Sequence, residues 1–445
     1  MAKSVSKRNT NLPALLLALA LSGSASAGDL LTVYRQAVDT NPQLAAAAAD
    51  LRAVREKRPQ GLAGLLPTLG LTGNIARQSF KNLNQSSPTS RSTSRSAGLQ
   101  LSQPLFRYDR WIQLKQADSA IAQAEAQYAA AQQDLMVTVA SRYFDVLGAE
   151  DKLEFALAEK KAIARQLDQA RQRFDVGLIA VTDVNEAQAR YDLSVSQEIL
   201  ARSQLQEARD ALREVTGAHY EQLLRLQNEL ELVSPEPASP DEWVRRAMEQ
   251  NLRVLAAQAG AETARQEIRR QRAGHLPTLD ASASYSYLDT NFGGIAPITR
   301  MDGEVGVQLK LPIYQGGLVS SRTREARSRF EQATELLQQE VRAAELETRN
   351  AFRNVDTAIA QVKALAQSLR STQVALEATE AGFEVGTRTI VDVLNAQREY
   401  HRAKLDHARA RYLYLVNRLR LKKAAGILTT DDLTAINKHL QGANP

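Results

Sequence analysis

Two similar segments carry charged side chains at matching positions. FDVGLIAVTDVNEAQARY (174–191) places Asp183 six residues after a glycine, and FEVGTRTIVDVLNAQREY (383–400) places Asp392 at the same point. The second segment also carries Arg388. From the residue types alone, both carboxylates are explained as first-turn residues that the helix dipole favours, and Arg388 as a solvated residue of a turn.

The rest of the chain gives no indication of enzyme chemistry. The five histidines are His219, His275, His401, His407 and His439. No two of them are four residues apart and the chain has no cysteine, so we expect no metal site. Nucleophile motifs, phosphate-binding loops and paired-carboxylate clefts are also missing from the sequence. We therefore expect neither an enzyme nor a bound cofactor.

The two Gly-centred segments belong to an internal duplication. Three further pairs match in the same order at offsets of 208 to 210 residues: GLLPTLGL (64–71) with GHLPTLDA (274–281), GLQLSQPLF (98–106) with GVQLKLPIY (306–314), and YRQAVDTNPQLAAAAA (34–49) with VRRAMEQNLRVLAAQA (244–259). This order predicts a first repeat over 28–232 and a second over 244–445, joined by the Pro-rich linker VSPEPASPDEW (233–243).

The first 27 residues have the pattern of a secretory signal peptide. Three basic residues precede the apolar run 12–21, and the small residues Ala25-Ser26-Ala27 follow it as a cleavage site. A transmembrane helix is the alternative, but a run of this length is too short to cross about 30 Å of hydrocarbon. We expect residues 1–27 to be removed on export.

The charge balance argues against a nucleic-acid partner. The chain carries a formal charge of +6, and cleavage of the signal peptide removes three basic residues and no acidic ones. A charge of about +3 on the mature chain is not the footprint of nucleic-acid binding. No later segment reaches 18 consecutive apolar residues, so any membrane contact is expected to come from strands.

Each repeat contains one predicted β-hairpin, at about 67–106 and about 277–314. Polar and apolar residues alternate strictly in 277–287 and again in 304–311, and a polar or Gly/Pro loop separates the strands. A half-buried soluble sheet would show the same alternation. The export signal and the aromatic residues near the strand ends favour an outer-membrane barrel instead.

Two very long helices follow the hairpins. Residues 318–381 contain neither Gly nor Pro, and a continuous helix of this length extends roughly 96 Å at ~1.5 Å per residue. Small and aliphatic residues from Val341 to Leu376 recur at spacings of three and four, which predicts a left-handed supercoil against a neighbour. The partner helix is expected over about 109–173, with returning helices over about 183–228 and 391–426.

The predicted strands imply an oligomer. Four strands per chain cannot close a membrane barrel, and an open edge is not tolerated in lipid. Two copies would give a filled interior of eight strands, whereas three would give twelve strands and room for solute. Hydrophilic inward positions such as Ser282 and Gln308 favour three copies. The expected assembly is a conduit.

The chain resembles the TolC family of outer-membrane efflux and secretion channels. The resemblance rests on VGTRTIVDVL (385–394), on ARYLYLVNRLRLKKAAGILTTDDLTAIN (410–437) and on FDVGLIAVTDV (174–184), and it extends over essentially all of 29–440. It implies an α+β membrane fold, in which three chains share a twelve-stranded β-barrel above a long periplasmic α-helical barrel. The hairpin tips at about 174–183 and 383–392 would then lie at the closed end, and a C-terminal equatorial segment would complete the second repeat.

The resemblance also implies a gate at these tips. Asp392 matches the lumen-facing carboxylate of the family, and three copies would form an anionic ring that attracts cations. Arg388 matches the basic residue that ties the tip closed through Thr182 and Asp183 of the first repeat.

Two positions depart from the family pattern. Asn395 stands where the TolC family has a further acidic residue, so the resemblance predicts one ring rather than two. Phe383 stands where the family has a tyrosine that donates a hydrogen bond to the residue matching Asp183. Phenylalanine has no hydroxyl, so that closing contact is expected to be missing.

The partners implied by the resemblance are two further copies in a homotrimer, outer-membrane lipid, a periplasmic adaptor and, indirectly, an inner-membrane transporter of the RND, ABC or MFS class. Six tip residues resemble the turns on which adaptor hairpins seat, namely Val176, Gly177, Leu178, Val385, Gly386 and Thr387. The function implied is that of an outer-membrane exit duct with a large periplasmic portion.

Two other functions remain to be distinguished. A structural or adhesive coiled-coil protein anchored by a barrel would place its long helices outside the cell, where added protease would cut them. A periplasmic adaptor would lack the membrane hairpins and would need a further β-domain, which the sequence does not show.

Overall fold

The computed structural model describes residues 28–81, 89–227, 230–292 and 297–441, and the predicted signal peptide at 1–27 lies outside them. The helices are α1 (Leu30–Thr40), α2 (Pro42–Arg55), α3 (Lys57–Ala63), α4 (Tyr108–Asp175), α5 (Val181–Thr216), α6 (Pro240–Gln250), α7 (Leu252–Arg272), the short η1 (Ala273–His275), α8 (Leu318–Glu384), α9 (Ile390–Ala424) and α10 (Thr430–Asn437). The strands are β1 (Thr68–Phe80), β2 (Ser90–Phe106), β3 (Arg225–Leu226), β4 (Thr278–Phe292), β5 (Ile298–Lys310) and β6 (Leu440–Gln441).

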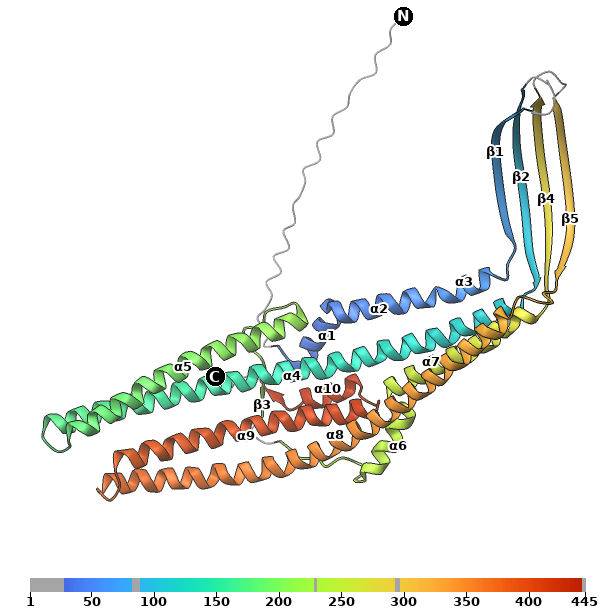
Figure 1. Cartoon of the computed structure of the whole chain (residues 1–445). Coiled ribbons are helices and arrows are strands. Elements are labelled where there is room, and N and C mark those ends of the chain that lie inside the picture. Colours follow the sequence, from blue (N-terminus) through green and yellow to red (C-terminus); the bar gives the residue numbers. More distant parts are fainter. Residues whose placement is uncertain (1–27, 82–88, 228–229, 293–296, 442–445) are drawn as a thin grey trace, which may run out of the picture.

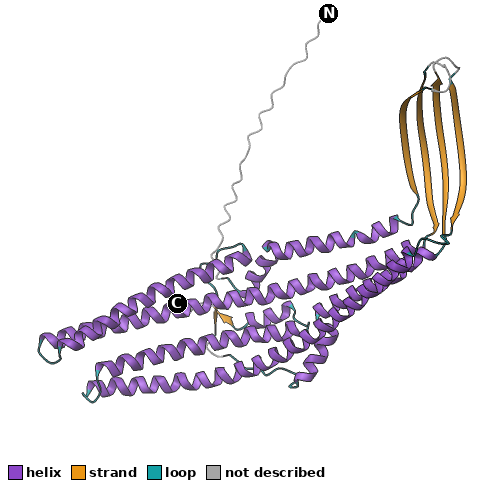
Figure 2. Ribbon diagram, in the orientation of Figure 1, coloured by secondary structure: helices purple, strands orange, loops and turns teal. Residues whose placement is uncertain are grey.

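The four long strands stand at one end of a bundle of long helices (Figures 1 and 2). Short helices lead into a hairpin in each repeat, and a long helix and its returning partner follow. α4 has 68 residues and α8 has 67, so each extends about 100 Å at ~1.5 Å per residue. Both long helices were predicted from the sequence, and α4 continues through Gly148 without a break.

The duplication is visible in matched hydrogen bonds. Asn41 Oδ1 accepts the backbone N–H groups at the start of α2, and its Nδ2 donates to the carbonyl of Val215 at 3.1 Å. Asn251 caps α7 in the same way and donates to the carbonyl of Ala424 at 2.9 Å. Each asparagine therefore joins the start of a short helix to the end of the returning helix of its repeat.

The first returning helix is shorter than the prediction of 183–228. α5 ends at Thr216 because Gly217 adopts a left-handed conformation with φ of +67° and caps the helix. The chain then runs to β3, which pairs antiparallel with β6, the short strand that follows α10. The predicted linker is also shorter than 233–243, because α6 begins at Pro240, and proline is well suited to a first helical turn.

All four long strands form one antiparallel sheet in the order β1-β2-β4-β5. The two predicted hairpins are confirmed, and the pairing of β2 with β4 joins the repeats. Within one chain, β1 and β5 are edge strands on which the described residues pair on one side only. The sheet of a single chain is therefore open at both edges.

The two faces of this sheet differ in polarity. The register places Ser102 opposite both Thr68 and Ser282, so even-numbered residues share one face and odd-numbered residues the other. The odd face is apolar and largely exposed, with Leu71 78% and Val305 86% accessible. From Leu279 to Tyr287 it extends about 27 Å along the strand at ~3.4 Å per residue, close to the ~25 Å apolar band of an outer-membrane barrel.

The hydrophobic core lies near the middle of the long helices. Tyr143 of α4 and Tyr414 of α9 are fully buried in it, with their hydroxyls bonded to the backbone at Leu224 and Val233. Burial raises the pKa of Tyr143 far above its ordinary value, so its hydroxyl remains a donor. The predicted seam of α8 is buried over the interval from Ala344 to Val362 and becomes half-buried towards the tip.

Candidate functional site

The two helical hairpins end in nearly identical turns. Gly177 and Gly386 both lie in the left-handed region, with φ of +75° and +78°. The residue after each glycine donates a backbone hydrogen bond of 2.8 Å to the carbonyl five residues earlier, at Arg173 in the first turn and Gly382 in the second. A Cβ at either glycine would meet no atom within 4 Å, so the positive φ rather than crowding accounts for glycine here.

The predicted docking residues form an exposed apolar surface on these turns. Val176, Leu178 and Val385 are 69%, 74% and 75% accessible. Thr387 is also exposed, and its hydroxyl donates to the carbonyl of Gly382 at 3.0 Å. Both turns are therefore hydrogen-bonded in their backbone and apolar at their tips.

Asp392 caps the helix that follows the second turn. Its Oδ2 accepts the backbone N–H of Thr389 at 2.9 Å and the Thr389 hydroxyl at 2.8 Å, while Thr389 Oγ1 accepts the N–H of Asp392 at 3.3 Å. These bonds from Thr389, with the nearby Arg388 cation, hold the pKa of Asp392 below its ordinary value. Asp392 Oδ2 therefore takes part in the helix cap, as the residue types alone suggested. The lowered pKa keeps the carboxylate charged at the tip.

Asp183 has different surroundings, although it is the equivalent residue of the first repeat. The N-cap position of α5 is Ala180, whose side chain cannot complete a capping box. Among the described residues the Asp183 carboxylate makes no hydrogen bond or ion pair, and the neighbouring Thr182 is exposed. Both side chains are thus open to a partner outside the chain.

Arg388 is exposed on the second turn. Its backbone N–H donates to the carbonyl of Gly382 at 3.2 Å, and a Cβ at Gly382 would lie only 2.8 Å from its Cγ. In the part of the chain that the structure describes, its guanidinium forms no ion pair with Asp183 and no bond to Thr182. The closing contact inferred from the resemblance therefore stays a prediction for contacts between neighbouring copies.

Phe383 does contact the first repeat, through a residue that sequence reasoning missed. The guanidinium carbon of Arg173, near the end of α4, lies 4.8 Å from the centroid of the Phe383 ring on α8. This is the geometry of a cation–π interaction. The sequence does single out Arg173 in one respect. The equivalent position of the second repeat is Gly382, so the two otherwise similar turns differ by a cation at this point.

An open cleft of about 620 Å³ separates the hairpins beside this contact. Its lining combines amides, charged side chains and the Phe383 ring, from Gln166, Gln169, Gln172, Arg173, Val176, Glu380, Phe383, Glu384 and Val393. Asn395, one turn beyond Asp392, is half-buried on α9 and adds no charge. The hairpins are therefore loosely packed at their tips, and the Arg173–Phe383 contact bridges the gap.

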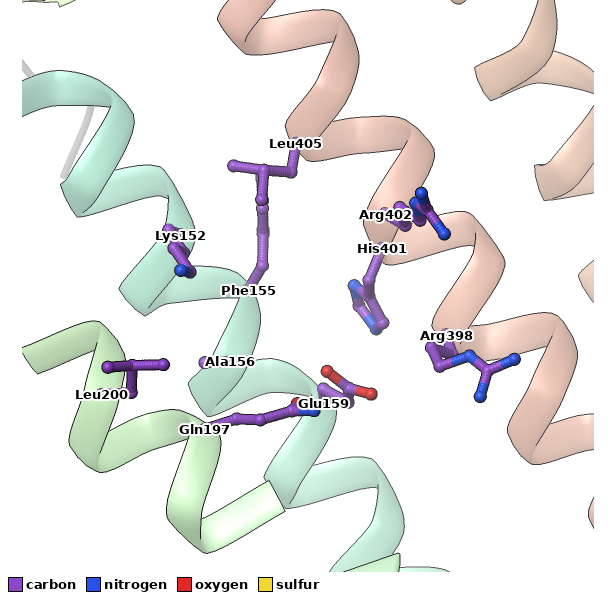
Figure 3. A pocket seen from close by; sticks show the side chains of 10 residues that line it. All are labelled: Lys152, Phe155, Ala156, Glu159, Gln197, Leu200, Arg398, His401, Arg402 and Leu405. Atoms are coloured by element: carbon purple, nitrogen blue, oxygen red, sulfur yellow. The ribbon is translucent and has the colours of Figure 1, made fainter. Parts of the chain in front are cut away.

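A second cleft of about 300 Å³ lies farther from the tips, between α4, α5 and α9 (Figure 3). Burial lowers the pKa of His401 and raises that of Glu159, both of which line it. Beside the cleft, Lys404 Nζ lies 4.8 Å from the centroid of the Phe155 ring, a second cation–π contact between the hairpins. The two hairpins thus share the same type of contact at two levels.

Within the described ranges, no group of three or more His, Cys, Asp or Glu side chains is arranged to hold a metal ion. Among these residues, the charges at the tips are those of ionised side chains such as Arg388 and Asp392.

Over the same residues, no helix combines the length and the apolarity needed to cross a membrane.

The geometry defines a class of protein. An open sheet with one apolar face adjoins helices about 100 Å long, whose far ends carry charged, Gly-centred turns. This is the architecture of an outer-membrane factor, a channel protein with a long periplasmic helical part.

Comparisons with known proteins agree with this assignment to the outer-membrane factors. Residues 33–218 and 243–427 each match the family described as outer membrane efflux protein. The chain is 39% identical to outer membrane protein TolC of Escherichia coli over 439 residues, which cover 96% of this chain and 88% of TolC. It is 30% identical to the protease secretion protein PrtF of Dickeya chrysanthemi, covering 97% and 96% of the two chains. Among solved structures, the CmeC outer membrane channel of Campylobacter jejuni has the same fold, with a TM-score of 0.79 at 16% identity over 99% and 98% of the chains.

The chain belongs to the outer membrane efflux protein family. It is an outer-membrane exit channel of the kind used in efflux and type I secretion, and not an enzyme. The two matched ranges also confirm the predicted duplication. Family membership excludes the adhesive coiled-coil protein and the periplasmic adaptor as alternatives.

Proposed function

We propose that three copies of the chain close one twelve-stranded barrel and pass cargo through a helical tube that is gated at the tips. The observation that carries this proposal is the four-stranded sheet with two open edges and one exposed apolar face. An edge strand cannot stay unpaired in lipid, so β1 of one copy pairs with β5 of the next. Three sheets of four strands leave an interior wide enough for solute.

The gate is formed by the two kinds of tip. Asp183 and Thr182 are free of partners within the described chain, and Arg388 is an exposed cation of matching chemistry. In the trimer, Arg388 donates charge-assisted hydrogen bonds to these residues and holds the tips closed. Three copies of Asp392 form an anionic ring at the constriction. Asn395 is neutral, so its position adds no second ring.

The exposed tips are the docking surface for a periplasmic adaptor, through which an inner-membrane transporter of the RND, ABC or MFS class delivers cargo. The hydrogen-bonded, left-handed turns at Gly177 and Gly386 expose Val176, Leu178 and Val385. Burial of exposed apolar side chains by a partner contributes favourable free energy to association.

Native mass spectrometry of the purified protein in detergent tests the assembly, and the expected mass is that of three chains. A stable, folded monomer would disprove the proposal. Complementation then tests the function, because a Gram-negative strain that lacks its own channel should regain either drug resistance or protein secretion. Measuring both outputs in the same strain identifies the cargo.

A further inference from the structure

The positive charge of the chain is concentrated where the helices meet the sheet. Four ten-residue segments adjoin this end of the strands, namely 57–66, 107–116, 267–276 and 318–327 (Figure 1). Together they contain eleven Lys and Arg residues and three Asp and Glu residues, a net charge of +8, whereas the whole chain carries +6. We call these four segments the basic collar.

Ion pairs within the chain neutralise only part of the collar. Arg58 pairs with Asp118 at 3.0 Å and Arg107 with Asp280 at 3.7 Å, and both of these carboxylates lie outside it. Its three carboxylates are already paired, as Asp109–Arg107 at 3.3 Å, Glu267–Arg270 at 2.7 Å and Glu325–Arg329 at 2.9 Å. Seven of its cations are exposed and form no ion pair among the described residues: Lys57, Lys115, Arg269, Arg272, Arg322, Arg324 and Arg327.

A neighbouring copy does not supply the missing charge. Copies related by an axis along the tube place the same segments at the same height, so each brings a further collar in which every carboxylate is already paired. Three copies gather about +24 within roughly 15 Å of the sheet, since ten helical residues rise ~1.5 Å each. Such a charge needs mobile counterions or a bound anionic ligand.

Apolar side chains beside the collar indicate which ligand this is. Ile313 and Tyr314, in the connection from β5 to α8, are 93% and 86% accessible, and Trp111 on α4 is half exposed. Ile313 and Tyr314 follow closely after the end of β5, and Trp111 lies in the first turn of α4, which begins two residues after β2. Trp and Tyr favour the level of the lipid headgroups. The collar therefore lies just beyond the apolar band, at the depth of the phosphates of the periplasmic leaflet.

We infer that the basic collar binds the headgroups of anionic phospholipids in the periplasmic leaflet of the outer membrane. Arginine is suited to this role because its planar guanidinium bonds two phosphate oxygens at once, while the rest of its side chain lies along apolar surface. Clusters of basic residues next to a membrane-spanning segment attract anionic lipid in the same way. Bound headgroups would set the depth of the barrel and neutralise the repulsion between copies.

Lipid titration of the purified protein tests the inference. Phosphatidylglycerol and phosphatidylcholine are added separately to protein in detergent, and bound lipid is counted by native mass spectrometry. The variant Arg269→Gln/Arg272→Gln/Arg322→Gln/Arg324→Gln should bind phosphatidylglycerol at least tenfold more weakly than wild type, with phosphatidylcholine binding unchanged. The control Arg171→Gln/Arg213→Gln/Arg353→Gln/Arg370→Gln removes four exposed arginines far from the sheet and should bind like wild type.

Several outcomes would overturn the inference. Equal binding of the two lipids by wild type, or wild-type binding by the collar variant, rules it out. Inorganic phosphate that competes with phosphatidylglycerol at equal concentration would identify a free-anion site instead. If the Gln variant does not assemble, the fourfold Arg→Lys variant replaces it and must keep the preference for phosphatidylglycerol. The inference rests on the proposed barrel. A collar variant that conducts like wild type but no longer binds phosphatidylglycerol would show that the barrel is intact and that only lipid binding is lost.

Discussion

The guanidinium of Arg173 lies over the ring of Phe383, with 4.8 Å between the guanidinium carbon and the ring centroid. These residues belong to different repeats, on α4 and α8, so the contact bridges the two hairpins near their tips. In the TolC family a tyrosine hydroxyl is expected at the Phe383 position. Here the face of the ring provides a contact that needs no hydroxyl.

Loss of this contact should favour the open channel. An exposed cation–π pair contributes about 0.5–1 kcal/mol, and a trimer contains three. Arg173→Gln should therefore raise the open-state population by roughly ten- to hundredfold, seen as higher conductance in planar bilayers. The control Arg171→Gln changes a neighbouring arginine that bonds Gln188 within the first hairpin, at 2.6 Å, and should conduct like wild type. Wild-type conductance of Arg173→Gln would show that the contact does not hold the tips.

Arg388→Ser should open the channel more strongly, because it removes the proposed charge-assisted link between copies rather than a contact within one chain. Asp183→Asn removes the other side of the proposed link, so the double variant should conduct no more than Arg388→Ser alone. Additive increases in single-channel conductance would mean that the two residues act separately.

The proposed anionic ring of Asp392 can be separated from its helix cap. Asp392→Asn removes the charge, and it should reduce cation selectivity and block by multivalent cations. Thr389→Ala weakens the capping box, at a cost of about 1 kcal/mol, but keeps the carboxylate. Reversal potentials in a salt gradient should therefore change in Asp392→Asn and remain unchanged in Thr389→Ala. Equal loss of selectivity in both variants would indicate that only the cap matters.

The tip glycines should be needed for docking but not for assembly. Gly386→Val places a β-branched residue at φ of +78°, so the turn should rearrange while trimers still reach the membrane. Cells carrying this variant should lose export, measured as drug resistance or protein secretion. Gly148→Ala is the matched control, because this glycine lies in α4 and a Cβ there would meet only a Tyr412 side-chain atom at 3.9 Å. Full export by Gly386→Val would contradict the docking role.

The two repeat asparagines should contribute equally to stability. Asn41→Ala and Asn251→Ala each remove a helix cap and a bond to a returning helix, at a cost of about 1–3 kcal/mol. Asn350→Ala, an exposed change on α8, should cost little. Thermal denaturation of the trimer measures all three. A loss confined to one asparagine would show that the repeats are not energetically equivalent.

Much of the architecture could be predicted from the sequence because it depends on local or periodic patterns. Alternating residues in 277–287 predicted a strand with one apolar face, and the absence of Gly and Pro over 318–381 predicted a very long helix. Matching segments at offsets of 208 to 210 residues revealed the duplication. The left-handed turns followed from Gly177 and Gly386 at the ends of helical patterns.

Other features were decided only by the tertiary structure, because they depend on residues far apart in the chain. The pairing of β2 with β4 joins two repeats that the sequence shows only as separate hairpins. The end of α5 at Thr216 is fixed together with the contact from Asn41 to Val215, 174 residues away. Arg173 and Phe383 meet across 210 positions, and no local pattern specifies which side chains face each other when two hairpins pack.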